Sequence, residues 1–210
     1  MGFVVQKYWL TGVLPAFRDG ISPLTATRII STSPNYSHVC GLTEEEVQTI
    51  AQAYLGSSLS DDELSQELQV IKRWYNGYRF CSPIHNMAPP LLYNPQQVFA
   101  HLQAIREGGY VNPHDEQNAT HTATVLNAIL TSGEMSMDDI LPLLDGGVQA
   151  SISHELGAPE VQRIGRDIKI TWSLLYYFGV ITHGDNHNLI VPNTTNHYLV
   201  CVDPSPLSAL

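Results

Sequence analysis

The chain has 210 residues, a hydrophobic content of 43% and a net charge of −10, from 20 acidic and 10 basic residues. The acidic excess opposes a general role in nucleic-acid binding, because such affinity depends on neutralising phosphates. No apolar run approaches the roughly 20 residues of a membrane helix, the N-terminus lacks a secretory pattern, and three cysteines without a Cys-x-x-Cys pair indicate free thiols, so we expect an intracellular protein.

The first predicted element is a strand. Residues 8–13 (Tyr-Trp-Leu-Thr-Gly-Val) form a compact apolar run, which is typical of a buried strand that opens into a loop at its C-terminal end. Residues 15–37 are rich in Ser, Thr, Pro and Gly and predict irregular structure.

Two helices with the same type of N-terminal cap follow. Thr43 and Glu46 are spaced as a capping box, and so are Ser60 and Glu63. Apolar residues at helical spacing predict one buried face on each helix. The first helix is expected to end at Gly56, and the second runs into residues 74 and 75.

Residues 74–80 (Trp-Tyr-Asn-Gly-Tyr-Arg-Phe) combine a helix end, a turn and the start of a strand. Asn76 and Gly77 are residues that adopt the left-handed backbone at a helix end. Tyr78 and Phe80 then alternate around Arg79, as in a short half-buried strand. We interpret this stretch as a structural corner around which the chain is organised.

A third helix is predicted to begin at Pro95, with Asn94 as its cap. Apolar patterns predict a fourth helix around residues 125–130 and a fifth helix, capped by Ser136, that continues through residues 140–144. No internal repeat or low-complexity tract interrupts this region.

The pattern changes towards the C-terminus. Residues 148–152 alternate as in a strand, and residues 170–178 predict a helix closed by Gly179. Residues 180–182 and 189–191 flank a Gly-Asp-Asn turn and predict a β-hairpin. Helices followed by such a hairpin indicate a winged-helix-like unit.

Five stretches in this order resemble the AAA-ATPase-like domain family, P-loop NTPases of fungi and bacteria that are often fused to a PD-(D/E)XK-type nuclease region. The stretches are residues 10–13, 40–47, 74–80, 93–95, and 172–179 followed by 191–193. The residues that carry the family motifs are Gly12, Gly41, Trp74, Tyr75, Asn76, Gly77, Tyr78, Tyr93, Asn94, Pro95, Trp172, Pro192 and Asn193.

The resemblance covers the C-terminal part of such a domain. The sequence contains no Gly-x-x-x-x-Gly-Lys-[Ser/Thr] motif and, ahead of Thr11, no apolar strand ending in paired acids. A complete family member is expected to bind ATP and Mg²⁺, but this chain lacks the phosphate cradle and the magnesium ligand, so we expect it to hold neither and not to hydrolyse ATP alone.

The resemblance implies a mainly α fold with minor β structure in three regions. Residues 1–37 would be a remnant of the ATPase core with its last strand, residues 38–131 a helical lid, and residues 132–210 a winged-helix-like region with a β-hairpin. Thr11 matches a residue that senses the γ-phosphate, and Arg18 and Arg28 are candidates for nucleotide-sensing arginines. The alternatives are that Thr11 only caps a strand and that both arginines are surface residues.

One other cluster has a plain structural interpretation. His183 and His187 flank the predicted hairpin turn around Asp185, and His and Asp can share a zinc ion. We interpret them as a polar turn and expect no metal site. Sequence motifs thus leave no residue with a catalytic assignment, and whether the chain is an enzyme stays open.

Three functions remain as hypotheses. The first is the lid and C-terminal portion of a nucleotide-dependent switch, and the second is a stand-alone module that binds a protein partner. The third, a DNA-binding winged helix, would use the basic residues Arg163, Arg166 and Lys169. We rank it last, because local acids can pair with these residues in a chain of net negative charge.

Overall fold

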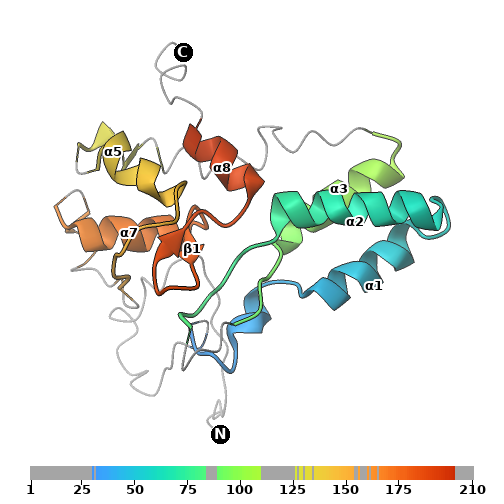
Figure 1. The fold of residues 1–210 in the computed structure, drawn as a ribbon, viewed down its shortest axis with the longest axis horizontal. Coiled ribbons are helices and arrows are strands. Elements are labelled where there is room, and N and C mark those ends of the chain that lie inside the picture. Colours follow the sequence, from blue (N-terminus) through green and yellow to red (C-terminus); the bar gives the residue numbers. More distant parts are fainter. Residues whose placement is uncertain are drawn as a thin grey trace, which may run out of the picture.

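The computed structural model describes residues 30, 32–83, 89–109, 126, 128–129, 131–133, 135–153, 156, 160, 162–164 and 166–201. Across these residues the protein is mainly helical, with a small antiparallel sheet of two strands. Figure 1 shows two lobes, with helices α1, α2 and α3 at one end and α5, α7, α8 and the hairpin at the other. The predicted strand at residues 8–13 lies outside the described residues.

The described residues between 37 and 109 form the helical lobe. After a short 3₁₀ helix, η1 (Ser37–Cys40), it contains α1 (Glu44–Leu55), α2 (Asp61–Tyr75) and α3 (Pro95–Arg106). Both predicted capping boxes are confirmed, with the side chains of Thr43 and Ser60 each accepting the N–H three residues on. Asn94 caps α3 and Pro95 is its first residue, as predicted.

The three helices pack on one another around a shared apolar core, because each presents one apolar face to the other two. The fully buried members of this core are Val47, Ala51, Leu55, Leu64, Ile71, Tyr75, Tyr93, Val98 and Leu102. One polar chain crosses it: the Tyr75 hydroxyl lies 3.1 Å from His101 Nδ1, and His101 Nε2 lies 3.1 Å from Glu67 Oε2.

The described residues between 126 and 201 form the hairpin lobe. Its elements are α5 (Met137–Ile140), the 3₁₀ helix η2 (Leu141–Leu143), α7 (Ile168–Tyr177), β1 (Thr182–His183), β2 (Leu189–Ile190) and α8 (Thr194–Cys201). The strands pair antiparallel with Thr182 opposite Ile190 and His183 opposite Leu189, so the predicted hairpin is confirmed.

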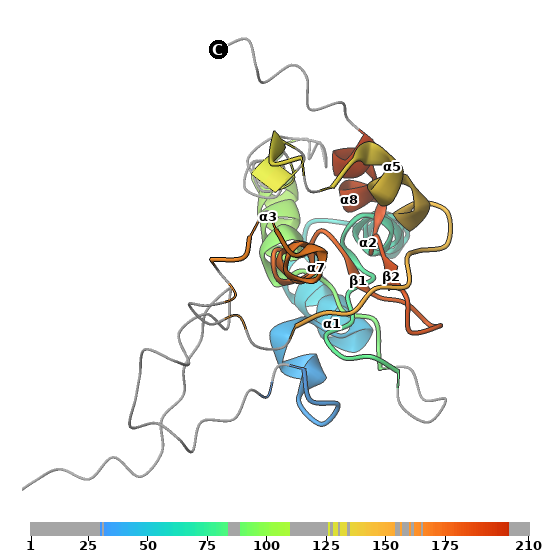
Figure 2. The ribbon, with the colours of Figure 1, turned by 90° about the vertical axis from the view of Figure 1, so that its left-hand side faces the viewer.

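Helix α7 lies at the centre of the second core. Six consecutive residues from Ile170 to Leu175 are buried, and residues of the hairpin and of α5 pack against them. The α7 axis runs close to the direction of α2, and Figure 2 shows both helices nearly end-on. The predicted closure at Gly179 is confirmed, since this glycine has a φ of +73° directly after the helix.

Two predicted elements differ in the structure. The fifth helix ends at Ile140 and continues as 3₁₀ turn over Leu141–Leu143, because Pro142 lacks the backbone N–H that an α-helix needs. Residues 148–152 form no strand; only Val148 makes a bridge, to Leu189. Of the fourth helix, residues 126, 128, 129 and 131 are helical. Within the described residues, no helix is long and apolar enough to cross a membrane.

Candidate functional site

The stretch 74–80 lies between the two lobes and joins them. Helix α2 ends at Tyr75, and Gly77 has a φ of +119°, which only glycine adopts easily. Asn76 instead has an extended backbone, with φ −83° and ψ 166°. The prediction of a left-handed Asn76 is therefore wrong, because its side chain serves the turn in another way: its Oδ1 accepts the Gly77 N–H at 2.7 Å.

Gly77 is also a place where the two lobes approach each other closely. A Cβ atom placed on it would lie 1.9 Å from the backbone oxygen of Pro192. The next residue, Tyr78, forms an antiparallel bridge to Leu92 rather than a strand of several residues. Gly77, Tyr78 and Pro192, which come from separate stretches of the sequence resemblance, therefore meet at one place.

Arg79 binds the hairpin through both its backbone and its side chain. Its N–H donates to Thr182 Oγ1 at 2.7 Å, and the same hydroxyl donates back to the Arg79 carbonyl at 2.8 Å. Its guanidinium donates to Asp185 Oδ1 at 2.5 Å and to the Pro89 carbonyl at 3.2 Å. Only 10% of the Arg79 side chain is exposed, so this charge depends on these partners.

Tyr78 and Trp74 connect the same stretch to α8. The Asn196 side chain donates to the Tyr78 hydroxyl at 3.1 Å and to the Gly179 carbonyl at 2.6 Å. Thr195 Oγ1 donates to the Trp74 carbonyl at 2.8 Å. Burial raises the pKa of Tyr78, and the neighbouring side-chain amides, among them Asn196 and Asn94, lower it only in part. The hydroxyl therefore stays protonated at neutral pH.

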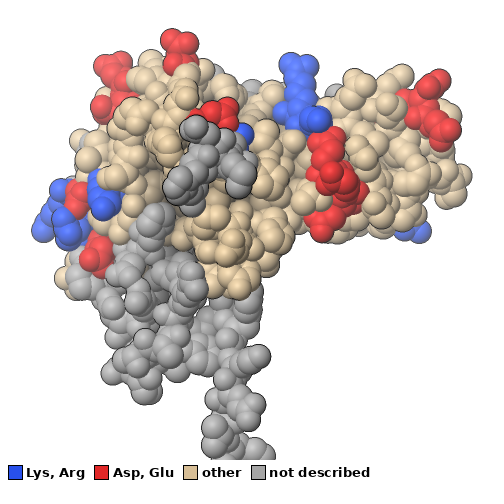
Figure 3. All heavy atoms as spheres, turned by 60° about the horizontal axis from the view of Figure 1, so that its bottom comes forward, with Lys and Arg blue, Asp and Glu red and all other residues tan. Residues whose placement is uncertain are grey.

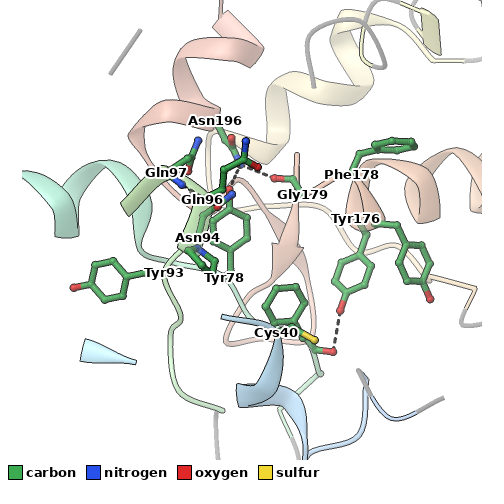
Figure 4. Close-up of a pocket in the computed structure, with 13 residues that line it drawn as sticks. Cys40, Tyr78, Tyr93, Asn94, Gln96, Gln97, Tyr176, Phe178, Gly179 and Asn196 are labelled. Carbon is green, nitrogen blue, oxygen red and sulfur yellow. Dashed lines mark hydrogen bonds between the residues drawn. The ribbon is translucent and has the colours of Figure 1, made fainter. Parts of the chain in front are cut away.

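A cleft of about 270 Å³ opens beside these contacts, lined by residues of both lobes. The helical lobe contributes Cys40, Tyr78, Phe80 and residues 93–97, and the hairpin lobe contributes residues 176–179 and Asn196. Figure 4 shows the side chains of Tyr78 and Tyr176 reaching towards it from different lobes. Several residues of the sequence resemblance therefore line one cleft, which we take as the candidate functional site.

The other described residues of the sequence resemblance lie outside the cleft, and their contacts are structural. Gly41 directly precedes Leu42, which forms a β-bridge with Tyr93. A Cβ atom added to Gly41 would lie 2.8 Å from Leu92 Cβ. Trp172 is buried in the core of the hairpin lobe, and Asn193 Oδ1 accepts the backbone N–H of Asn196. The candidates Thr11, Gly12, Arg18 and Arg28 lie outside the described residues.

The hairpin turn has the polar character that we predicted for it. Asp185 pairs with Arg79, and His187 Nδ1 lies 2.9 Å from Ser82 Oγ. His183 is buried, with its ring 5.1 Å from that of Tyr176. Among the described residues, no three His, Cys, Asp or Glu side chains are grouped so that they could hold a metal ion.

One of the basic residues before α7 pairs with a local acid, as the sequence analysis expected. Arg163 pairs with Asp167, the residue that caps α7, and the Glu160 carbonyl accepts the Arg163 backbone N–H. Arg166 and Lys169 are exposed. On the face drawn in Figure 3, basic side chains lie close to acidic ones and form no continuous basic surface.

Sequence reasoning missed several residues of the junction, by which we mean the contacts of residues 74–80 with the hairpin lobe and the cleft beside them. Thr182 and Asn196 carry its hydrogen bonds, and Gln97 lines the cleft, but none belongs to a motif that we singled out. The sequence did contain one signal for Asn196. Asn193 lies three residues before it, and this is the spacing between an N-cap residue and the backbone N–H that its side chain accepts. Nothing in the sequence indicates the pairing of Thr182 with Arg79.

Comparisons with protein-family models, with curated proteins and with solved structures all give no match for this chain.

Proposed function

We propose that the chain is the lid and winged-helix-like portion of an AAA-ATPase-like protein. The observation that carries this proposal is the convergence of its motifs. Residues 74–80, 93–95, 176–179 and 192–193 are distant in the sequence, yet they contact one another at the junction and its cleft. Residues that contact one another in the fold are expected to occur together in related sequences. Their contacts therefore support the interpretation of the separate stretches as one family pattern.

The arrangement of the lobes suits a part that moves as one body. The helical lobe would be the lid, and α7, the hairpin and α8 would be the winged-helix-like region. Hydrogen bonds from Trp74, Tyr78 and Arg79 hold the two together. In a complete family member, ATP bound in the core would order the lid and thereby reposition the hairpin lobe.

In the AAA-ATPase-like family, ATP and Mg²⁺ are expected to bind to the P-loop and to the strand that ends in paired acids. This sequence contains neither motif. The chain alone is therefore proposed to bind no ATP. Because a ligand that binds the folded state raises its melting temperature, Mg·ATP should leave the melting temperature of the purified chain unchanged. A clear rise would contradict the proposal.

A second experiment tests the positive half of the proposal. A P-loop core from an AAA-ATPase-like protein, expressed without its own lid, is mixed with this chain and passed over a gel-filtration column. Co-elution should require ATP, and it should be lost when the P-loop lysine of that core is replaced by alanine. Absence of co-elution with several such cores would count against the proposal.

A stand-alone protein-binding module is the second candidate, and the cleft between the lobes favours it. This function needs no nucleotide, so a partner would bind equally with and without ATP. The DNA-binding hypothesis ranks last, because the net charge is −10 and Arg163 is already paired with Asp167. Undetectable binding to a random duplex at low salt would exclude it.

A further inference from the structure

Aromatic residues are the largest group among the residues that line the cleft between the lobes. Six of its lining residues are aromatic: Tyr78, Phe80, Tyr93, Tyr176, Tyr177 and Phe178. Two pairs among them are in ring contact, with Tyr78 and Phe80 stacked at 6.4 Å between centroids and Tyr176 and Tyr177 edge-on at 5.2 Å. No Lys, Arg, His, Asp or Glu is found among its described lining residues.

The tyrosine hydroxyls of the cleft are already engaged. Tyr93 donates to Glu44 at 2.6 Å, Tyr176 to the Phe80 carbonyl at 2.9 Å and Tyr177 to the Ser153 carbonyl at 3.2 Å. Burial raises the pKa of Tyr177 to about 12 and also raises that of Tyr176, so both stay neutral. The Tyr93 ring is buried in the core of the helical lobe, so what the cleft offers to a ligand is the rings on its two sides, among them those of Tyr78 and Tyr176.

One acceptor in the cleft lacks a partner. Gln97, in the first turn of α3, is 7% exposed, and its side-chain oxygen Oε1 has no hydrogen-bond partner among the described residues. A buried carbonyl oxygen without a partner is costly, so this atom calls for a donor. Figure 4 shows Gln97 beside Asn94 and Asn196 at the same side of the cleft.

We propose that this cleft binds a small alkylammonium group, with the aromatic rings around the charge and Gln97 Oε1 accepting an N–H. Ring faces attract organic cations, and aromatic cages recognise methylated ammonium groups in this way. The inference does not rest on the proposed ATPase relationship, because it uses only the lining of the cleft.

Charge and size both favour this class of ligand over others. The cleft presents no cation for an anionic ligand, while the chain carries a net charge of −10. Burial raises the pKa of the Cys40 thiol, so the cleft holds no thiolate at neutral pH. Its volume of about 270 Å³ lies just below the usual range of roughly 300–1,000 Å³ for ligand pockets, which suits a headgroup rather than a larger molecule.

The first test compares three probes of similar size by titration calorimetry on the full chain at neutral pH. They are choline, protonated dimethylethanolamine, and the neutral alcohol in which a carbon replaces the nitrogen of choline. Both cations should bind, and the neutral alcohol should bind at least about tenfold more weakly, because it lacks the attraction to the rings. Equal binding of the alcohol, or no binding of either cation, would overturn the proposal.

Variants of the chain locate the binding. Phe80→Leu should weaken cation binding about threefold by removing one ring, whereas Phe99→Leu, an exposed residue of α3 outside the cleft, should leave it unchanged. If both variants bind like the original chain, the cation lies elsewhere and the assignment of the cleft is wrong.

Gln97 has its own readout. Dimethylethanolamine carries an N–H and choline does not, so it should bind more tightly than choline by about threefold, and Gln97→Met should abolish this difference. Gln69→Met, at an exposed position of α2, should preserve it. A difference that survives Gln97→Met would overturn the role of Gln97.

The same ammonium chemistry occurs in free amines and in methylated lysine side chains. A peptide with one dimethylated lysine is compared with the same peptide carrying acetylated lysine, and with dimethylethanolamine. Tighter binding of the methylated peptide than of the free amine would assign the cleft to a protein partner, and equal binding would assign it to a free amine. Equal binding of the acetylated and methylated peptides would overturn the proposal.

Discussion

Gly77 sets the distance between the lobes at the level of a single residue. Replacing it by alanine should lower the free energy of unfolding by at least about 2 kcal/mol, because the added Cβ meets the Pro192 oxygen at 1.9 Å and the backbone has φ +119°. Urea denaturation followed by circular dichroism measures this loss.

Gly108 provides the matched control for that substitution. It also has a positive φ, of +73°, but nothing lies within 4 Å of the position of its Cβ. Gly108→Ala should therefore cost only the backbone strain, about 1 kcal/mol. If the two variants were equally stable, the close approach to Pro192 would not matter for stability.

His101 makes the stability of the helical lobe depend on pH. Burial lowers its pKa and outweighs the nearby Glu67 carboxylate, which raises it. The unfolded chain, with an ordinary histidine pKa of about 6.5, then binds a proton more readily than the folded one. Stability from this residue is present above that pH and is lost as the pH falls through it.

The measurement is the free energy of unfolding at pH 7.5 and at pH 5.5, above the range where the carboxylates titrate. The original chain should be less stable at the lower pH, and His101→Gln should show a smaller difference between the two. An equal difference in both proteins would assign the effect to other histidines.

At the scale of the element, the helix caps were the most predictable features. A capping box is local, so four residues specify it, and Ser60 with Glu63 forms it as expected, with the Ser60 N–H 2.8 Å from Glu63 Oε2. Ser60→Ala should lower the free energy of unfolding by about 1 kcal/mol. Ser65→Ala, exposed within the same helix, should have no destabilising effect, since alanine is the better helix former. Thermal and urea unfolding of both variants would check this.

Elements that depend on distant partners were harder to predict. The alternation of residues 148–152 indicated a strand, but only Val148 finds a neighbouring backbone to pair with. The apolar periodicity predicted that the fifth helix continues through residues 140–144. In the structure its α-helical hydrogen bonding ends before Pro142. The hairpin was predictable because its turn residues lie between its strands.

At the scale of the molecule, Thr182 links the lobes through both hydrogen bonds to the Arg79 backbone. Thr182→Val keeps the shape but leaves a buried N–H without its acceptor, which should cost about 1–3 kcal/mol. The same substitution at the exposed Thr49 of α1 should cost much less. Calorimetry should give a single unfolding transition for the original chain. If Thr182→Val showed a separate transition for the helical lobe at an unchanged temperature, the lobes would not be coupled through Thr182.

The candidate site could be predicted only in part for the same reason. Residues 74–80 were recognised as the corner of the fold, and the structure confirms that they join two lobes. Their partners Thr182 and Asn196 could not be named, because one hydroxyl and one amide in a list of many carry no sequence pattern. The aromatic cleft arises only when residues 176–179 fold back against residues 93–97.

The contact between Arg79 and Thr182 spans 103 positions of the chain, and this has a consequence for synthesis. A ribosome adding roughly 5–20 residues per second synthesises Arg79 about 5 to 20 seconds before it reaches Thr182 in the hairpin. During that interval Tyr78 and the Arg79 guanidinium have no partners from the second lobe. Nascent chains of this protein should therefore depend on chaperones between these two points, a dependence that ends when Thr182 and Asn196 emerge.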